Sequence, residues 1–152
     1  MEGSMKKSLI LLLVLFSLIL FTDFSYSLCV KVPDANLRSG PSTKSKKTWA
    51  VFKYMPFKKL SKKGNWYKVR DVDGDIHWIY TKLVTNKFKC AVVKVEKANI
   101  RNGPGTNYNT NALSPSLKYD SYKVLQTKSS WVNVIDEFGD KGWIYRKLLW
   151  IY

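Results

Sequence analysis

The sequence is short of the residue types that build catalytic and helical proteins. Its 152 residues include one histidine, two cysteines and 11 acidic residues, against 26 basic residues. After residue 27, no segment repeats its apolar residues with the 3.6-residue period of an amphipathic helix. No glycine-rich loop follows a strand and opens a helix, as a phosphate-binding loop requires. A helical body and a phosphate-loop nucleotide site are therefore not expected.

Groups that could carry out catalysis are also scarce. An enzyme site needs a nucleophile, a base or a metal, and His77 is the single histidine. His77 alternates out of phase with Trp78, which predicts a packing or solvent-facing side chain on the other side of the strand. Neither Cys29 nor Cys90 stands where a helix start would activate a thiolate. No spacing of acidic residues indicates a catalytic pair, so we predict that the chain is not an enzyme.

Asp71, Asp73 and Asp75 stand at alternate positions around Gly74. Such a cluster could hold a cation, but the segment lacks the later bidentate acid of a calcium-binding loop. The same pattern makes a good turn, because aspartate side chains bond the local backbone and glycine tolerates the turn geometry. The turn is the preferred interpretation, and we predict no metal and no cofactor.

The first 27 residues have the layout of a secretory signal peptide. Lys6 and Lys7 precede an apolar run from Leu9 to Phe21, and the small residues Ser25 and Ser27 follow. This pattern predicts cleavage after Ser27 and export to the periplasm or the cell exterior. An uncleaved membrane anchor is the alternative, but the run of about 13 residues is shorter than the roughly 20 that span a bilayer. Lipid attachment at Cys29 would need a small residue before it, where Leu28 stands.

The rest of the chain contains an internal duplication. The stretch Trp66–Tyr80 recurs 65 positions later as Trp131–Tyr145, with identical residues at eight matched positions. In each copy, two runs rich in aromatic and β-branched residues flank a glycine turn, which predicts a β-hairpin. An upstream stretch, 35–43, recurs 63 positions later as 98–106, so the second copy has two extra residues in a loop within 107–118.

Each copy is predicted to contain five or six short strands with regular turns. Val-Lys-Val alternates like a half-buried strand at the start of each copy, and middle strands are expected at 57–62 and 122–127. Many short strands favour a small β-barrel. The predicted organisation is a signal peptide at 1–27, one barrel at 28–86 and a second at 87–152. A unit of about 60 residues can fold alone with modest stability.

The two cysteines open the two copies. Cys29 stands at the start of the first and Cys90 at the start of the second. In an exported protein two cysteines suggest one disulfide, and the ends of a small barrel lie close together. A Cys29–Cys90 bond would close a loop of about 60 residues and stabilise the fold by a few kcal/mol. Two free buried thiols are the alternative.

The repeated motifs resemble bacterial SH3-like (SH3b) domains. The first copy has Asn36-Leu-Arg-Ser-Gly-Pro41, Met55-Pro56 and Trp78-Ile79, and the second has Asn99-Ile-Arg-Asn-Gly-Pro104 and Gly142-Trp143-Ile144. The resemblance covers nearly all of the chain after the leader. It implies two tandem all-β SH3-like barrels outside the cytoplasm that bind peptidoglycan or peptides without catalysis. His77 in place of Gly142, and Asp120-Ser121 in place of Met-Pro, indicate that the copies differ in ligand preference.

Aromatic side chains are the predicted ligand contacts. Tryptophans that recur in both copies, such as Trp66 and Trp131 or Trp78 and Trp143, are assigned to the barrel core or its rim, because an aromatic ring buries a large area at low entropic cost. Copy-specific or out-of-phase aromatics offer a flat face for sugars or peptides instead. We therefore predict ligand contacts at Trp49, Tyr54, Tyr67, Tyr108 and Tyr119.

The excess of positive charge predicts an anionic partner. A basic patch is expected at Lys44, Lys46, Lys47, Lys58 and Lys59, and such a surface attracts polyanions. Lysines among aromatics also suit single-stranded nucleic acid, but the leader argues against this partner. The alternative for the patch is a solvated lysine-rich surface.

Together these features predict an exported, non-catalytic binding protein of the cell envelope. The predicted partner is peptidoglycan, an envelope protein or peptide, or an anionic envelope surface. The alternative is a targeting or regulatory partner of a separate cell-wall hydrolase.

Overall fold

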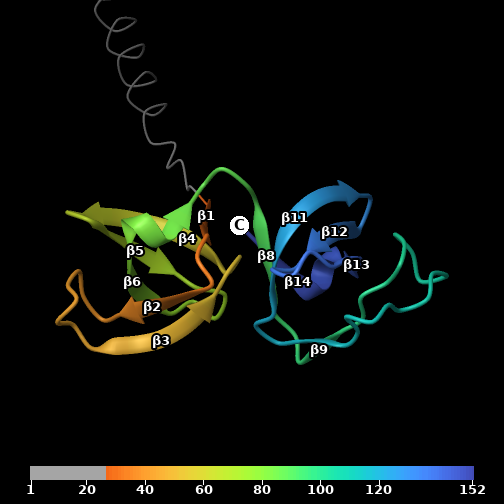
Figure 1. Ribbon diagram of the computed structural model, residues 1–152, viewed down its shortest axis with the longest axis horizontal. Coiled ribbons are helices and arrows are strands. Elements are labelled where there is room, and N and C mark those ends of the chain that lie inside the picture. The colour runs from red at the N-terminus through yellow and green to blue at the C-terminus, as the bar shows by residue number, and fades with distance from the viewer. Residues whose placement is uncertain (1–26) are drawn as a thin grey trace, which may run out of the picture.

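The computed structural model describes residues 27–152, and the fold they form is all-β (Figure 1). The two helical elements are single 3-10 turns, η1 (Thr81–Leu83) and η2 (Arg146–Leu148). Within residues 27–152, no helix is long and apolar enough to span a membrane. The predicted signal peptide lies outside the described residues apart from Ser27, which begins the first strand.

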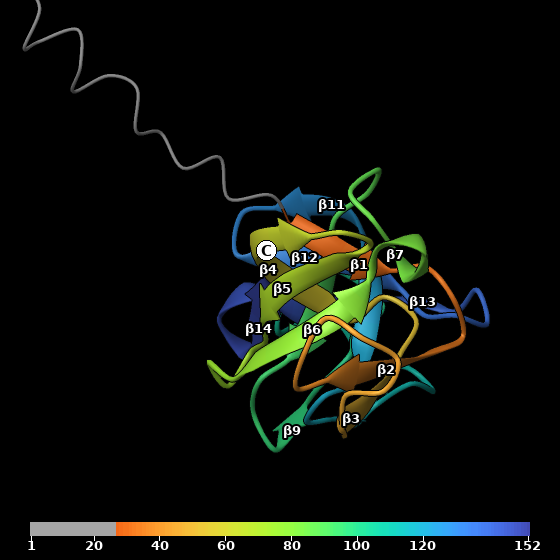
Figure 2. The same ribbon diagram turned by 90° about the vertical axis from the view of Figure 1, so that its left-hand side faces the viewer.

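Residues 27–85 form the first lobe, one sheet of seven strands. Its strands are β1 (Ser27–Val30), β2 (Asp34–Arg38), β3 (Lys47–Phe52), β4 (Pro56–Lys63), β5 (Trp66–Arg70), β6 (Ile76–Tyr80) and β7 (Val84–Thr85). Their order in the sheet is β3-β2-β6-β5-β4-β1-β7, and every neighbouring pair is antiparallel. Figure 2 looks onto this lobe.

Residues 90–151 form the second lobe, which also contains seven strands. They are β8 (Cys90–Val93), β9 (Lys97–Ala98), β10 (Ser116–Leu117), β11 (Ser121–Lys128), β12 (Trp131–Ile135), β13 (Lys141–Tyr145) and β14 (Leu149–Ile151). Five of them pair in the order β13-β12-β11-β8-β14, while β9 and β10 pair separately. The order matches β6-β5-β4-β1-β7 of the first lobe.

Individual backbone contacts also recur at matched positions. Arg38 pairs with Trp78 across β2 and β6, and Arg101 forms an isolated bridge to Trp143. In each lobe the backbone N–H and C=O of a valine in the first strand form hydrogen bonds with the two residues that precede the fourth strand. These bonds are Tyr54 N to Val30 O and Val30 N to Met55 O in one lobe, and Tyr119 N to Val93 O and Val93 N to Asp120 O in the other.

Both hairpins are closed by the predicted aspartate–glycine turn. The backbone N–H of Asp71 donates to the carbonyl of Asp75 at 3.0 Å, and Asp136 repeats this bond with Asp140. Gly74 and Gly139 have φ angles of 94° and 99°, a region that a residue with a Cβ rarely adopts. The residues around Gly74 and Gly139 therefore form the predicted turns.

Two hydrophobic clusters form the core, and the first one extends across the junction of the lobes. Alternate residues of β2, β5 and β6, such as Leu37, Val69 and Ile79, are buried in it, as period-2 strands require. Val92 of β8 belongs to this same cluster, with Trp150 packed against it. The second cluster lies within the second lobe.

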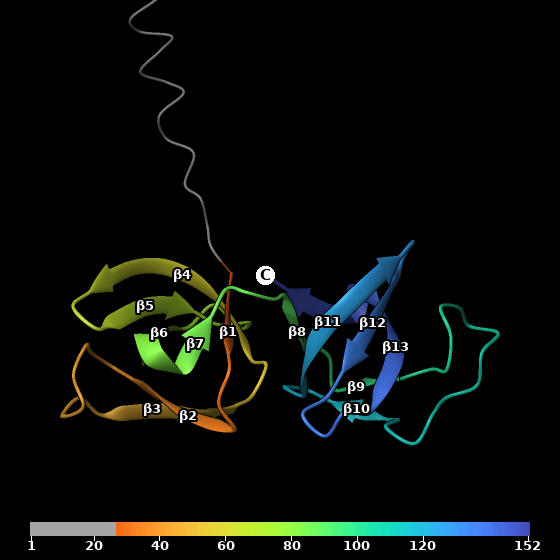
Figure 3. The same cartoon turned by 45° about the horizontal axis from the view of Figure 1, so that its top comes forward.

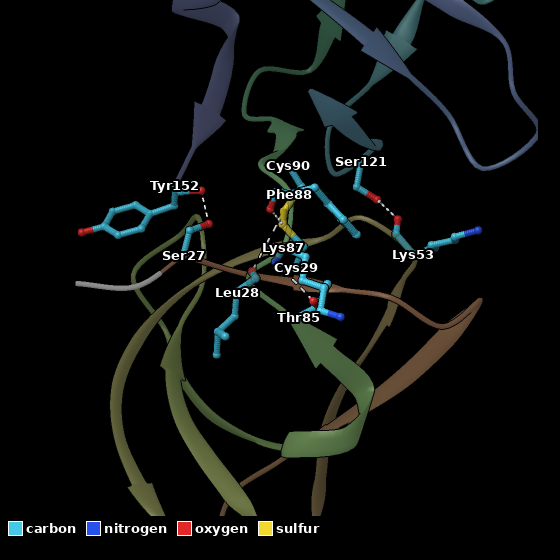
Figure 4. The surroundings of a disulfide bond; sticks show 10 residues. All are labelled: Ser27, Leu28, Cys29, Lys53, Thr85, Lys87, Phe88, Cys90, Ser121 and Tyr152. Carbon is cyan, nitrogen blue, oxygen red and sulfur yellow. Dashed lines mark hydrogen bonds between the residues drawn. A yellow bond between two sulfur atoms is a disulfide. The ribbon is translucent and has the colours of Figure 1, made fainter. Parts of the chain in front are cut away.

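Strands β1 and β8 lie near the centre of the molecule (Figures 1 and 3), and a disulfide joins them (Figure 4). It links Cys29 and Cys90, both fully buried, so the predicted pairing is confirmed. Figure 4 shows its surroundings: Ser121 of the second lobe donates to the carbonyl of Lys53 at 2.8 Å, and the hydroxyl of Ser27 donates to the carbonyl of Tyr152. The lobes are therefore held together at several points.

The structure contains more strands than the five or six predicted for each copy. Strand β3 was not predicted, because its apolar residues Trp49 to Phe52 form a continuous run and do not alternate with polar residues. Strand β7 has two residues and follows η1 without a turn signal. The predicted middle strands are present as β4 and β11, each extended by one residue at both ends.

Candidate functional site

The candidate site lies on the outward side of β5 and β6 and of their counterparts β12 and β13. Alternation along these strands sends Val69, Ile79 and their counterparts inward. The outward positions carry large half-buried rings, which are Trp66, Trp78 and Tyr80 in the first lobe and Trp131, Trp143 and Tyr145 in the second. None of these six side chains belongs to a core cluster of residues 27–152.

Strand register brings two of the rings together in each lobe. Trp66 lies opposite Tyr80, and their ring centroids are 5.5 Å apart; Trp131 and Tyr145 repeat this pair at 5.6 Å. Cross-strand aromatic pairs of this kind stabilise a sheet and present a broad apolar surface. Because the rings are half-exposed, they remain open to a ligand.

An arginine on the neighbouring strand holds the loop beside these rings. The guanidinium of Arg38 donates to the carbonyl of Ser45 at 2.8 Å, and that of Arg101 donates to the carbonyls of Tyr108 and Thr106 at 2.6 and 3.3 Å. The arginine of the repeated Asn-apolar-Arg motif therefore positions the loop that follows it. Gly103 is required there, because a Cβ would stand 2.3 Å from the ring of Tyr108.

In the second lobe these elements enclose a cleft of about 590 Å³. The side chains that line it combine flat rings with hydrogen-bonding groups, namely Lys97, Asn99, Arg101, Thr106, Asn107, Trp131, Tyr145 and Leu148, together with Gly105. Asn99 is exposed, and its side chain makes no hydrogen bond to any residue in 27–152.

The name outer aromatic face is used below for five residues of each lobe. They are Asn36, Arg38, Trp66, Trp78 and Tyr80 in the first lobe, and Asn99, Arg101, Trp131, Trp143 and Tyr145 in the second.

The chemistry of this face suits recognition of neutral and anionic groups. Indole and phenol rings stack on sugar rings or peptide planes, the asparagine amide both donates and accepts hydrogen bonds, and arginine pairs with carboxylates. Nothing in the face pairs a nucleophile with a base.

The five aromatic residues predicted as ligand contacts do not form one site. Tyr119 lies at the junction of the lobes. The centroid of its ring is 5.2 Å from that of Trp49, and its hydroxyl donates a hydrogen bond to Asp73 at 2.8 Å. Tyr54 packs against the linker residue Phe88, and Tyr67 packs against the first core cluster.

Tyr108 is the candidate that lies on the loop of the cleft, and it is 43% exposed. Tyr54 and Tyr119, which correspond between copies, share φ angles of 70° and 75°. Their common feature is this backbone conformation, because each amide closes the contact to the first strand of its lobe.

The predicted basic patch is divided between two parts of the first sheet. Lys44, Lys46 and Lys47 lie on the β2–β3 connection and the start of β3, whereas Lys58 and Lys59 lie on β4. Strands β2, β6 and β5 separate β3 from β4 in the sheet order. The ammonium groups of Lys58 and Lys59 stand over the rings of Tyr152 and Tyr67, at 5.4 and 4.7 Å from the centroids.

The paired rings of the outer aromatic face were not predicted as ligand contacts. Recurrence at matched positions assigns the tryptophans to the barrel core or its rim, and the structure places them outside both core clusters, at the surface of the strands. Their phase in the strands was the available signal, since Trp66 and Trp131 alternate with buried valines of the same hairpins.

A group of hydrogen-bonded polar side chains lies at the β5–β6 turn of the first lobe. His77 is buried and its Nε2 lies 3.1 Å from Oδ2 of Asp71, while its Nδ1 lies 2.8 Å from the hydroxyl of Thr48. As expected, His77 faces the other side of its strand from Trp78. Asp71, Asp75 and His77 each offer one potential metal-ligating atom, and these three atoms lie within 4.8 Å of one another.

Within residues 27–152, the pKa is shifted for two side chains of the second lobe, Tyr122 and Lys118. Burial raises the pKa of Tyr122 to about 12, although its hydrogen bond with Ser116 acts in the opposite direction. A hydrogen bond with Tyr119 and the negative charge of Asp73 raise the pKa of Lys118. Lys118 and Asp73 form an ion pair of 3.7 Å across the lobe junction.

One known family matches part of the chain. Residues 31–86 match the bacterial SH3 domain. This SH3 region begins directly after β1 and contains the outer aromatic face of the first lobe. No match is found among curated proteins.

Solved structures give weaker similarities, which span both lobes. An NlpC/P60 family protein from Bacillus cereus ATCC 10987 is 14% identical with a TM-score of 0.39, over 83% of this chain and 56% of that one. NlpC2 from Trichomonas vaginalis is 13% identical with a TM-score of 0.36, over 83% and 48% of the two chains.

The CBD of the endolysin LysPBC5 is 18% identical with a TM-score of 0.34, over 84% of this chain and 93% of that one. The chain thus spans about half the length of the NlpC/P60 and NlpC structures that it matches.

Proposed function

We propose that the chain is an exported, non-catalytic binding protein made of two tandem SH3-like barrels. The two barrels bind peptidoglycan through their outer aromatic faces. The observation that carries the proposal is the match of residues 31–86 to the bacterial SH3 domain, because this region contains Asn36, Arg38, Trp66 and Tyr80. The same four residue types recur at matched positions around the cleft of the second lobe. The buried disulfide fits an oxidising compartment outside the cytoplasm.

Peptidoglycan matches the chemistry of this face. Its sugar rings can stack on the tryptophan–tyrosine pairs, its acetamido groups and peptide bonds can bond the asparagine, and its free carboxylates can pair with arginine. The formal charge of +15 would draw an anionic polymer toward the surface.

The test is co-sedimentation of the purified chain with peptidoglycan sacculi. We expect the wild-type protein to pellet with the sacculi, and Trp131→Ala to weaken binding roughly tenfold, because a lost aromatic contact is worth about 1 kcal/mol or more. Asn99→Ala is a milder variant that removes an exposed amide and leaves the packing of the rings intact. Trp66→Ala and Asn36→Ala test the first lobe in the same way.

Phe138→Ala is the matched control, since Phe138 is 85% exposed on the β12–β13 turn and lies outside the face. This variant should bind like the wild type. Failure of the wild-type chain to pellet at low salt would refute the proposal, and equal loss in the control would refute the assignment to the outer aromatic face.

The absence of catalysis is tested separately. Thr48, His77 and Asp71 form a hydroxyl–imidazole–carboxylate chain, the composition of a catalytic triad. We expect no clearing of cell-wall material in a zymogram with the purified chain. Clearing that is lost in Thr48→Val would overturn the non-catalytic assignment.

A further inference from the structure

The β5–β6 turn of the first lobe contains a cluster of metal-ligating groups apart from the outer aromatic face. Asp71 is 4% exposed and His77 is 8% exposed, while Asp75 is exposed at the surface. A pocket of about 240 Å³ opens over the three side chains and is also lined by Trp49 and Tyr119. The cluster is thus mostly buried but accessible to a small ion.

The local hydrogen bonds fix the direction of two ligand atoms. Oδ1 of Asp71 accepts the backbone N–H groups of Asp73 and Asp75 at 3.1 and 2.8 Å, so its other oxygen is the one that faces His77. The orientation of the imidazole ring is fixed by a hydrogen bond between its Nδ1 and the Thr48 hydroxyl. Histidines that ligate metals are oriented in this way by a partner on the second ring nitrogen.

The second lobe shows that the turn does not need the histidine. Asp136 makes the same bonds, accepting the N–H groups of Phe138 and Asp140 at 2.9 Å each. Gly142 stands in place of His77, and a Cβ there would lie 2.2 Å from a methyl carbon of Ile100. The buried imidazole of His77 and its hydrogen bond to Asp71 are therefore not needed to form the turn. Burying these polar groups costs free energy, because they lose their contacts with water.

We propose that Asp71, Asp75 and His77 bind Zn²⁺, with Oδ2 of Asp71, Nε2 of His77 and a carboxylate oxygen of Asp75 as ligands. Zn²⁺ bonds imidazole nitrogen and carboxylate oxygen at about 2.0–2.2 Å, which places tetrahedral ligands roughly 3.3 Å apart. The observed separation of 3.1 Å between Nε2 and Oδ2 is close to this value. In the bound state Nε2 ligates Zn²⁺ and the neutral imidazole carries its one proton on Nδ1, which donates to the Thr48 hydroxyl, so that the proton between Nε2 and Oδ2 moves to Nδ1 through solvent; water completes the coordination.

The donor set also selects the class of cation. Imidazole nitrogen suits Zn²⁺ and its first-row neighbours, whereas Ca²⁺ and Mg²⁺ prefer oxygen ligands. The bound ion would lie in the same turn as Asp73, which accepts the hydroxyl hydrogen of Tyr119 from the other lobe. The site is independent of the peptidoglycan proposal, because it shares no residue with the outer aromatic face.

The experiment titrates Zn²⁺ into the full chain, purified without a polyhistidine tag, by calorimetry. Because the chain has a single histidine, its imidazole ¹⁵N signals report the ligand directly. We expect one equivalent of Zn²⁺ to bind and to shift the Nε2 resonance of His77. Titration of Ca²⁺ should leave this resonance unchanged.

Variants separate ligation from folding. His77→Gln should abolish Zn²⁺ binding, and Asp75→Asn and Thr48→Val should each weaken it by about tenfold or more. Asp75→Asn changes an exposed side chain whose turn bonds use only the backbone, so it tests the site even where His77→Gln does not fold. Asp140→Asn, at the matched position of the second lobe, should bind Zn²⁺ like the wild type.

Absence of Zn²⁺ binding by the wild-type chain would overturn the proposal. Binding that leaves the imidazole resonances unchanged, or that survives in both His77→Gln and Asp75→Asn, would overturn it equally.

Discussion

Tyr122 shows how burial changes the chemistry of one side chain. It is 5% exposed in the second core cluster, and its hydroxyl is bonded to Ser116 at 2.8 Å. Ser116 in turn donates to the carboxylate of Asp120 at 3.1 Å, so the tyrosine hydroxyl is the donor in its own bond. Burial disfavours the phenolate, which raises the pKa of Tyr122 to about 12.

This raised pKa predicts a loss of stability in alkaline solution. The unfolded chain releases the Tyr122 proton near pH 10 and the folded chain near pH 12, so the folded state binds more protons in between. The contribution is fully present below pH 10 and is lost as the pH rises from about 10 to 12. We expect it to amount to roughly 3 kcal/mol, because one pKa unit corresponds to about 1.4 kcal/mol.

Urea unfolding at a series of pH values between 9 and 12 measures this loss. Tyr122→Phe should be less stable at pH 8, because the Ser116 oxygen loses the hydrogen bond that it accepts from Tyr122, but should show a shallower decline above pH 10. Absorbance near 295 nm follows tyrosine ionisation directly. Equal slopes for the two proteins would show that Tyr122 is not the titrating group.

At the scale of elements, the two hairpin turns depend on glycine for a backbone reason alone. Gly74 and Gly139 have φ angles of 94° and 99°, and an added Cβ would meet no atom within 4 Å at either position. Alanine should therefore destabilise through backbone strain, without a clash, by about 1–2 kcal/mol.

Midpoints of urea unfolding for Gly74→Ala and Gly139→Ala measure this strain. Gly74→Asn is the matched control, since asparagine enters the left-handed region more readily than alanine and should lose less stability. A Gly74→Ala protein as stable as the wild type would contradict the assigned turn geometry.

The sequence predicted elements with strong local signals and missed those defined by distant partners. The hairpins of β5–β6 and β12–β13 were predictable, because alternating aromatic and β-branched residues flank a glycine turn. Strand β3 was not predicted, since it exists through its pairing with β2 and has little pattern of its own. The pairing of Cys29 with Cys90 was predictable because only two cysteines are present.

The sequence predicted aromatic ligand contacts but not the residues of the outer aromatic face. Trp66 and Tyr80 come together through strand register, which the sequence hints at only by alternation. Tyr119, a predicted ligand contact, packs on Trp49 of the other lobe, and this contact depends on how the lobes are joined. The contact of His77 with Thr48 joins β6 to β3 and required the fold.

At the scale of the whole molecule, the lobes share part of one core. Val92 of the second lobe is buried in the first hydrophobic cluster, and Tyr119 and Trp150 pack against it. The Tyr119–Asp73 and Ser121–Lys53 hydrogen bonds add polar contacts across the same junction. Neither lobe buries its own junction surface alone, so we expect the chain to unfold as one cooperative unit.

The disulfide should account for much of this cooperativity. It links residues 61 positions apart, and closing such a loop in the unfolded chain is worth about 4 kcal/mol in the chain-entropy account. The double variant Cys29→Ser/Cys90→Ser should therefore lose stability of this order. Because Cys29 and Cys90 are fully buried, some of the measured loss will come from burying serine hydroxyls. Cys29→Ala/Cys90→Ala serves as the comparison that avoids this cost.

Scanning calorimetry of the wild type, the alanine pair and the alanine pair with Tyr119→Ala distinguishes the contributions. We expect one transition for the wild type, with equal calorimetric and van't Hoff enthalpies, and one at lower temperature for the alanine pair. Removing Tyr119 as well deletes the ring on Trp49 and the bond to Asp73, so the transition should broaden or split as the lobes unfold separately. Two independent transitions in the oxidised wild-type chain would mean that the shared core around Val92 does not couple the lobes.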